Sequence, residues 1–357
     1  MRLGVALLAF VGLTACGGGA VTGADGGALR DGGAWADGGS PPARDGGTTS
    51  TDAGASCADP CQCAERGPPN FSAANDGRAT PTSDNDQRAA LQRANRWRTA
   101  AGLAPLNAHA QLEQAAGAHA HYLSTNSEAQ CWSNAHAELS SCSGYTGVSA
   151  GPRAAAAGYR YRLVTEVIDW RPTVEDAVDT WIWTVYHRRS FFNPLLVDVG
   201  YARRYGPYHA RQEFHNVMDF GQPPSGNPAL PAAPAVFPLP GQVDVPLAFD
   251  GARESPLPAA PPAGWPSGAV ISAHPPAAAL TITTHKLFRA NDGACTEVSH
   301  RFLARNVDPN LEERDSNEVF LYADAPLAPS TEYVVQLEGM FAGRAYARTW
   351  AFTTARQ

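Results

Sequence analysis

Apolar residues recur with helical spacing in three stretches of the chain. The first stretch begins at a capping residue, Ser83 or Asp84, and ends at Gly102. The second spans residues 107–126, and the third runs from Pro172, which suits a first helical turn, to about Arg189. The apolar positions of the first two stretches are Leu91, Ala94 and Trp97, then Leu112, Ala115, Ala116 and Leu123. The pattern predicts three helices.

Strand patterns lie between and after these helices. Residues 162–170 are short and rich in β-branched side chains, which predicts one strand. Residues 195–221 predict two more strands, joined by a turn at Gly206 and Pro207. The order helix, helix, strand, helix, strand, strand predicts an α+β domain over residues 84–221.

The last part of the chain has a different pattern. Residues 222–235 are rich in Pro, Gly and Ala and predict a stiff linker, and residues 236–357 contain short alternating runs typical of a small all-β sandwich. Within this part, Leu327, Pro329, Thr331 and Tyr333 fit a tyrosine corner, in which the tyrosine bonds back to the preceding loop. The ending "TWAFTT" resembles the last strand of bacterial immunoglobulin-like modules.

The N-terminus predicts export. Arg2 precedes a short apolar run that closes with Leu-Thr-Ala-Cys at Cys16. This ending resembles the bacterial lipobox, which implies a signal peptide over residues 1–15 and a lipid on Cys16; an ordinary secreted protein that is cut nearby is the alternative. Residues 16–56 are Gly- and Asp-rich and predict a disordered tether, followed by a Cys-containing lead-in segment over residues 57–83.

Charge and cysteine content narrow the functional classes. The net charge is −7 with one lysine, so the chain lacks the basic surface of a nucleic-acid binder. Six cysteines remain after Cys16, and an even number in an exported chain favours disulfides. Cys131 and Cys142 lie in one loop-like segment and are predicted to pair, while the partners of the other four stay open: Cys57, Cys61, Cys63 and Cys295.

The segment 84–221 resembles the bacterial form of the CAP superfamily, which includes cysteine-rich secretory, antigen five and pathogenesis-related proteins. The resemblance rests on Asn95 and Arg98 before "GLAPL", on the Leu-x-x-Ala-Ala-x-x-His-Ala rhythm of the second helix, and on "HRRSFFNP", "DVGYA" and "VMDFG" in that order. It implies a three-layer α/β/α sandwich.

The same resemblance implies a cleft built from two histidines and two acids. Carried over by position, these are His136, Glu166 and His187, with Thr184 where the second acid would stand; His119 and His121 are alternatives to His136. Trp181 and Thr184 would line the cleft, because they share a helical face with His187.

Two imidazoles and a carboxylate allow three interpretations. They could hold a zinc ion, act as a general acid/base set with Glu166 as the base, or form a buried polar network. Ser149 in "GVSAG" matches a nucleophile pattern, but a polar loop precedes it instead of a strand.

Taken together, these features predict an exported protein, lipid-anchored to the cell envelope. Its CAP domain is predicted to bind a lipid, another envelope component or a protein without catalysis. A metal-dependent hydrolase that uses His136, Glu166 and His187 is the alternative.

Overall fold

The computed structural model describes residues 59–67, 85–132, 134–209, 211–226, 228–291, 294–313 and 317–356. These residues belong to one compact unit. The predicted signal peptide, the lipid site at Cys16, the tether and most of the lead-in segment lie outside them. No helix within these ranges has the length and hydropathy needed to cross a membrane.

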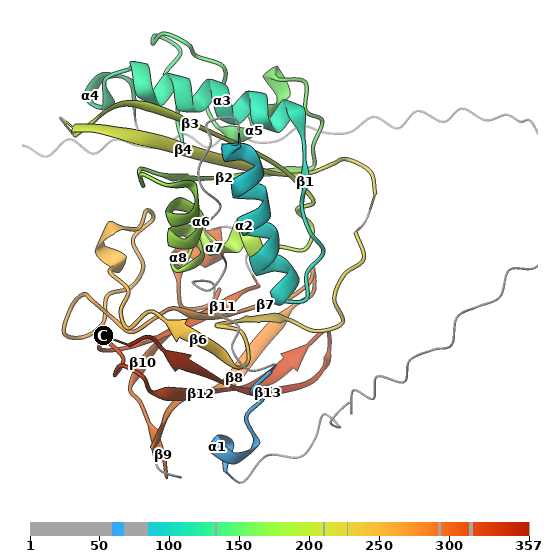
Figure 1. Ribbon diagram of the computed structural model, residues 1–357. Coiled ribbons are helices and arrows are strands. Elements are labelled where there is room, and N and C mark those ends of the chain that lie inside the picture. Colours follow the sequence, from blue (N-terminus) through green and yellow to red (C-terminus); the bar gives the residue numbers. More distant parts are fainter. Residues whose placement is uncertain are drawn as a thin grey trace, which may run out of the picture. The chain divides into compact units, whose positions relative to one another are not determined.

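A four-stranded sheet with the strand order β1-β3-β4-β2 lies between two layers of helices (Figure 1). Its strands are β1 (Asn107–Ala108), β2 (Leu163–Asp169), β3 (Asp198–Tyr208) and β4 (Arg211–Gln222). One layer is formed by α3 (Ala110–Thr125) and α5 (Ala150–Ala156), with the short α4 (Glu128–Cys131) after α3. The other layer is formed by α2 (Asp86–Ala100), α6 (Val174–Ile182) and α7 (Arg188–Phe192). The predicted mixture of helices and sheet is confirmed.

The two faces of the sheet alternate along β2, as strand geometry requires. Val167 packs into the core beside α2 and α6, whereas Ile168 packs with Ala116 and Ala120 of α3. Glu166 therefore faces α3, on the same side as Ile168. This alternation decides which charged groups Glu166 can meet.

The predicted turn at Gly206 and Pro207 is wrong, because β3 continues through both residues and the hairpin turn lies between Tyr208 and Arg211. The glycine serves a different purpose. A Cβ at position 206 would lie 2.5 Å from the carbonyl oxygen of Ser124, at the end of α3. Gly206 thus allows α3 to approach the sheet closely.

Two predicted helices have different bounds in the structure. The second helix starts at Ala110 instead of residue 107, because Asn107 pairs in parallel with Asp198 of β3. The third is interrupted between Ile182 and Arg188. Glu254, from beyond residues 84–221, accepts the backbone N–H groups of Val185 at 3.0 Å and Tyr186 at 2.5 Å. These donors would otherwise continue the helix.

The C-terminal part contains two further sheets, with the strand orders β10-β11-β7-β5 and β6-β13-β12-β8-β9. Their strands are β5 (Ala235–Phe237), β6 (Gln242–Val245), β7 (Ile271–His274), β8 (Leu280–Asn291), β9 (Ala294–Glu297), β10 (His300–Leu303), β11 (Val319–Ala323), β12 (Glu332–Phe341) and β13 (Arg344–Thr354). A 3-10 turn, η2 (Gly251–Arg253), and a short helix, α8 (Pro309–Glu313), lie in the connections.

Side chains from both C-terminal sheets share one core. Ile271 and Leu321 from the first sheet pack with Val335 and Trp350 from the second. The hydroxyl of Tyr333 accepts the backbone N–H of Ala328 at 2.9 Å, which confirms the bond predicted for the tyrosine corner.

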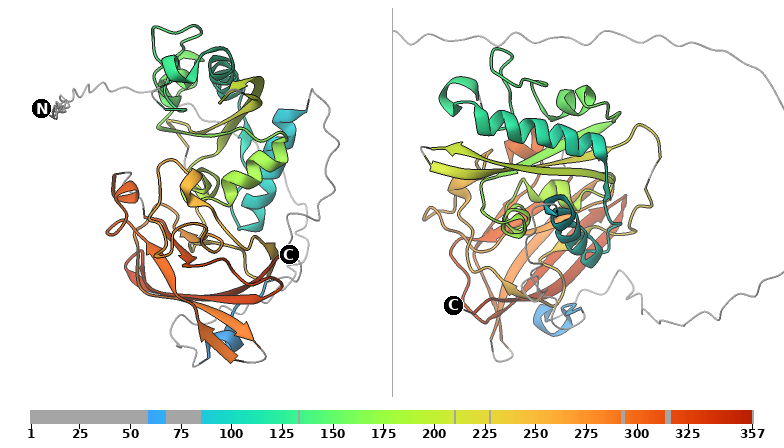
Figure 2. Two further views of the ribbon diagram at one scale, coloured as in Figure 1. Left: turned by 90° about the vertical axis from the view of Figure 1, so that its left-hand side faces the viewer. Right: turned by 45° about the horizontal axis from the view of Figure 1, so that its top comes forward.

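The helical layer of α2, α6 and α7 packs directly against the C-terminal sheets (Figure 2). Phe237 of β5 contacts the rings of Trp97, Trp183 and Phe192, with centroid distances of 5.4, 4.9 and 5.4 Å. The fully buried Arg188 donates to the carbonyl of Val270 at 3.0 Å. The two parts are therefore joined by a continuous apolar core.

Candidate functional site

The structure brings His136 and Glu166 together beneath the segment that joins α4 to α5. Nδ1 of His136 lies 2.9 Å from Oε1 of Glu166. The Glu166 side chain is 3% exposed and that of His136 is 39% exposed, so the pair connects a buried carboxylate to the surface.

His119, one of the alternatives to His136, belongs to the same cluster. Its Nδ1 lies 2.8 Å from Oε1 of Glu138 and its Nε2 lies 2.9 Å from the carbonyl oxygen of Ala135. Both neighbours offer acceptor oxygens, so the ring of His119 links Glu138 to the backbone at Ala135. The side chain of His121, the other alternative, takes no part in this network, and the residue is exposed.

Two members of the cluster were not predicted from the sequence, Arg153 and Glu138. Arg153, on α5, donates to Oε2 of Glu166 at 2.6 Å and to the carbonyl of His136 at 3.1 Å. Glu138 accepts the backbone N–H groups of Thr146 at 2.6 Å and Gly147 at 3.2 Å. No local sequence pattern marks either residue, because the partners lie on other elements of the fold, such as Glu166 on β2 and His119 on α3.

Burial raises the pKa of both glutamates, whereas nearby charges and hydrogen bonds lower it. Burial acts to raise the pKa of Glu166, but the charges of His119 and Arg153 and the hydrogen bond of His136 hold that pKa well below its usual range. Burial also opposes ionisation of Glu138, yet the hydrogen bonds of His119 and Thr146 keep its pKa below the ordinary value. Both carboxylates are ionised.

The pKa of Asp219 is shifted in the opposite direction. It is fully buried on β4, directly across from Glu166 in the sheet register. Burial, then the charge of Glu166, raise the pKa of Asp219 well above its usual value. A protonated Asp219 can donate to Glu166, which explains why neither of its oxygens accepts a hydrogen bond from a described residue.

The protonation of Asp219 predicts a specific pH dependence. An acid whose pKa is raised by folding contributes stability below its unfolded pKa, about 3.9, and loses this contribution as pH rises through the folded pKa. We expect the free energy of unfolding of wild type to fall above about pH 4 relative to that of Asp219→Asn, because the asparagine side chain does not titrate.

Urea denaturation of both proteins from pH 4 to pH 8 measures this difference. Asp169→Asn is the matched control, because burial raises the pKa of Asp169 to about 6 and its contribution is lost by that pH. Parallel pH profiles for wild type and Asp219→Asn would show that Asp219 is ionised in the fold.

His187 lies in a different environment from His136 and Glu166. Its Nδ1 is 3.3 Å from the hydroxyl of Thr184 and 3.3 Å from Oε1 of Glu254. Trp181 is a core residue, and its indole N–H donates to the carbonyl of Ile168 at 3.0 Å. Glu254, from the C-terminal part, thus stands beside Thr184, at the position that lacks the second acid.

The carboxylates of the buried cluster are poor metal ligands as they stand. Each oxygen of Glu166 already accepts a hydrogen bond, one from His136 and the other from Arg153. Across the described ranges, the sole group of three or more His, Cys, Asp or Glu ligand atoms within 4.8 Å of one another is Asp59, Cys61 and Cys295. The two sulfurs of that group are already joined in a disulfide. The arrangement fits a charge-balanced polar network better than a zinc centre.

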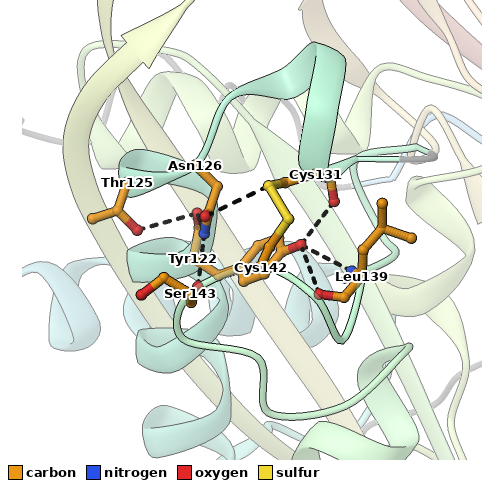
Figure 3. Close-up of a disulfide and its surroundings, with 7 residues drawn as sticks. All are labelled: Tyr122, Thr125, Asn126, Cys131, Leu139, Cys142 and Ser143. Carbon is orange, nitrogen blue, oxygen red and sulfur yellow. Dashed lines mark hydrogen bonds between the residues drawn. A yellow bond between two sulfur atoms is a disulfide. The ribbon is translucent and has the colours of Figure 1, made fainter.

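The segment over this network is fixed at several points (Figure 3). Cys131 and Cys142 form the predicted disulfide, which is confirmed. The hydroxyl of Tyr122 donates to the carbonyl of Cys131 at 2.7 Å and accepts the N–H of Leu139 at 2.8 Å. The Asn126 amide donates to the carbonyl of Ser143 at 2.8 Å. These contacts hold the segment in one conformation.

Exposed apolar side chains concentrate in and next to this segment. Half of the ten large apolar side chains that are exposed in the described part of the chain lie within 25 residues of one another. They are Leu139, Tyr145, Val148, Tyr161 and Leu163, which are 37, 41, 54, 36 and 37% exposed. Arg160 and Arg162 alternate with them and are exposed as well.

Residues 91–220 match the model of the CAP family, described as the cysteine-rich secretory protein family. No curated protein matches the chain. Two solved structures are similar over 41% of it, each with a TM-score of 0.31. One is an extracellular protein with an SCP domain from Bacillus anthracis, with 18% identity, of which 45% is covered. The other is an outer surface protein from Borrelia burgdorferi, with 16% identity, of which 98% is covered.

Proposed function

We propose that the CAP domain is a non-enzymatic binding module that contacts a lipid surface through the segment between α4 and β2. The observation that carries this proposal is the concentration of exposed apolar side chains at 139–163, in a stretch whose backbone at Thr146 and Gly147 is held by the buried Glu138. On this view the His/Glu cluster is a support, and the surface above it is the site.

The occupied hydrogen-bonding positions of the cluster favour binding over hydrolysis. The Glu166 side chain is 3% exposed and its oxygens accept hydrogen bonds from Arg153 and His136, so it offers little surface to a substrate. Arg153 lies 2.6 Å from Glu166 and His119 lies 2.8 Å from Glu138, so each buried carboxylate already has a basic partner inside the protein.

The chemistry of the exposed side chains favours an amphipathic ligand. Tyrosine has an apolar ring and a polar hydroxyl, which suits the boundary between headgroups and acyl chains. Arg160 and Arg162 add positive charge that anionic headgroups attract, at about 1 kcal/mol per residue. Tyr161 lies against the first turn of α5, since a Cβ on Gly151 would be 2.7 Å from its hydroxyl.

Vesicle sedimentation tests the proposal. The full chain with Cys16→Ser, which lacks the predicted lipid attachment site, should bind vesicles of phosphatidylglycerol and phosphatidylcholine more tightly than pure phosphatidylcholine. Val148→Asp should weaken binding at least about tenfold, because one inserted side chain contributes about 1.5 kcal/mol or more.

Val307→Asp is the matched control, because Val307 is 58% exposed in the C-terminal part. Equal losses in the two variants, or no sedimentation with either vesicle, would contradict the proposal. The hydrolase alternative has a separate signature: turnover of an activated ester that His136→Ala removes while vesicle binding is retained.

A further inference from the structure

Two histidines of the C-terminal part face each other outside the site described above. Nδ1 of His285 lies 2.9 Å from Nε2 of His300, and both side chains are half-buried. His285 belongs to β8 in the five-stranded sheet and His300 to β10 in the four-stranded sheet. The pair therefore bridges the two sheets.

Both rings are fixed by their surroundings. Nδ1 of His300 donates to the carbonyl of Val298 at 2.9 Å, which places the lone pair of the neutral ring on Nε2, toward His285. The ring of His285 stacks on Phe302, with centroids 4.1 Å apart and an interplanar angle of 2°. Protein histidines that bind metals are typically oriented in this way, by a bond from the second nitrogen to a backbone carbonyl.

We propose that His285 and His300 form a binding site for a divalent transition-metal ion. Two nitrogens that share a tetrahedral ion at about 2.0–2.1 Å are about 3.4 Å apart, so the rings need to separate by only about half an ångström. The ion takes the place of the proton between the rings. That proton leaves Nδ1 of His285 and one binds to its Nε2, so the ring stays neutral and both facing nitrogens present lone pairs.

The remaining coordination positions fall to water, since two protein ligands are provided. Imidazole nitrogens suit Cu²⁺, Ni²⁺ and Zn²⁺, and the affinity should be higher for Cu²⁺ than for Zn²⁺. Because the ion would link β8 to β10, it should also stabilise the sandwich.

Calorimetric titration of the full Cys16→Ser chain with Cu²⁺ and with Zn²⁺ tests this site. We expect one high-affinity ion per chain, a rise in melting temperature, and nitrogen couplings in the Cu²⁺ electron paramagnetic resonance spectrum. His285→Ala and His300→Ala should each weaken binding more than about tenfold.

Two controls separate this site from other histidines. His136→Ala, in the buried cluster, and His209→Ala, at an exposed position beside Glu128, should leave the ion bound. If either alanine variant in the pair unfolds, as judged by circular dichroism, His285→Asn or His300→Gln takes its place. Binding that survives loss of His285 or His300, binding lost with His136, or no saturable binding would overturn the proposal.

Discussion

Replacing Arg153 with methionine should lower the free energy of unfolding by about 3–5 kcal/mol, the typical cost of removing one partner from a buried ion pair. Arg153 is fully buried and donates to Glu166 at 2.6 Å, with Glu138 also within 3.9 Å. Without its guanidinium, the buried carboxylates of Glu138 and Glu166 would lose their arginine partner. Urea denaturation followed by circular dichroism at pH 7 measures the loss.

Two further variants make this result specific. Arg160→Met changes an exposed arginine close by in the chain and should alter stability by less than about 0.5 kcal/mol. Adding Glu166→Gln to Arg153→Met should restore part of the loss, because it removes one uncompensated charge. If Arg153→Met unfolds at the same urea concentration as wild type, the network does not support the fold.

Replacing Glu254 with alanine should cost a similar amount, about 3–5 kcal/mol, because Glu254 combines a buried charge with several backbone hydrogen bonds. It is 6% exposed, accepts the N–H groups of Val185 and Tyr186, and its charge acts on the buried Arg188. Its loss leaves these donors without an acceptor in the middle of the junction.

Hydrogen exchange gives this prediction a local readout. The amides of Val185 and Tyr186 should lose protection in Glu254→Ala beyond what the drop in global stability explains. Glu254→Gln, which keeps one acceptor oxygen, should fall between wild type and alanine. Glu312→Ala, at an exposed position in the same part of the chain, is the control. Unchanged exchange at residues 185 and 186 would contradict the role of Glu254.

The fold could be predicted where local patterns decide it. The strand predicted within residues 162–170 and the stop at Gly102, which has a φ of 76°, are set by neighbouring residues, and both are found. The break between α6 and α7 could not be predicted, because Glu254 lies 68 residues beyond Tyr186. The position of the hairpin turn was mispredicted for the same reason: Gly206 is needed for the close approach of α3, which is distant in sequence, and not for a turn.

The candidate site was predictable in part for similar reasons. The family resemblance gave His136 and Glu166, which do meet at 2.9 Å. It gave His187 as well, but strand alternation turns Glu166 toward α3, while His187 lies beside Glu254. Because successive side chains of a strand point to opposite faces, the burial of Val167 against α2 and α6 places Glu166 on the other face of the sheet. Arg153 could not have been found, since its role depends on how α5 packs beside β2.

The disulfide between Cys61 and Cys295 determines how mechanical tension would pass through the molecule. It joins α1 (Pro60–Cys63) to β9 across 234 residues of sequence. A pulling force applied before Cys61 and resisted after Cys295 passes directly through the sulfur–sulfur bond. The α+β domain over residues 84–221 lies within the bypassed loop, so this force does not run along its backbone. A molecule stretched between these two points would therefore keep that backbone outside the path of the force.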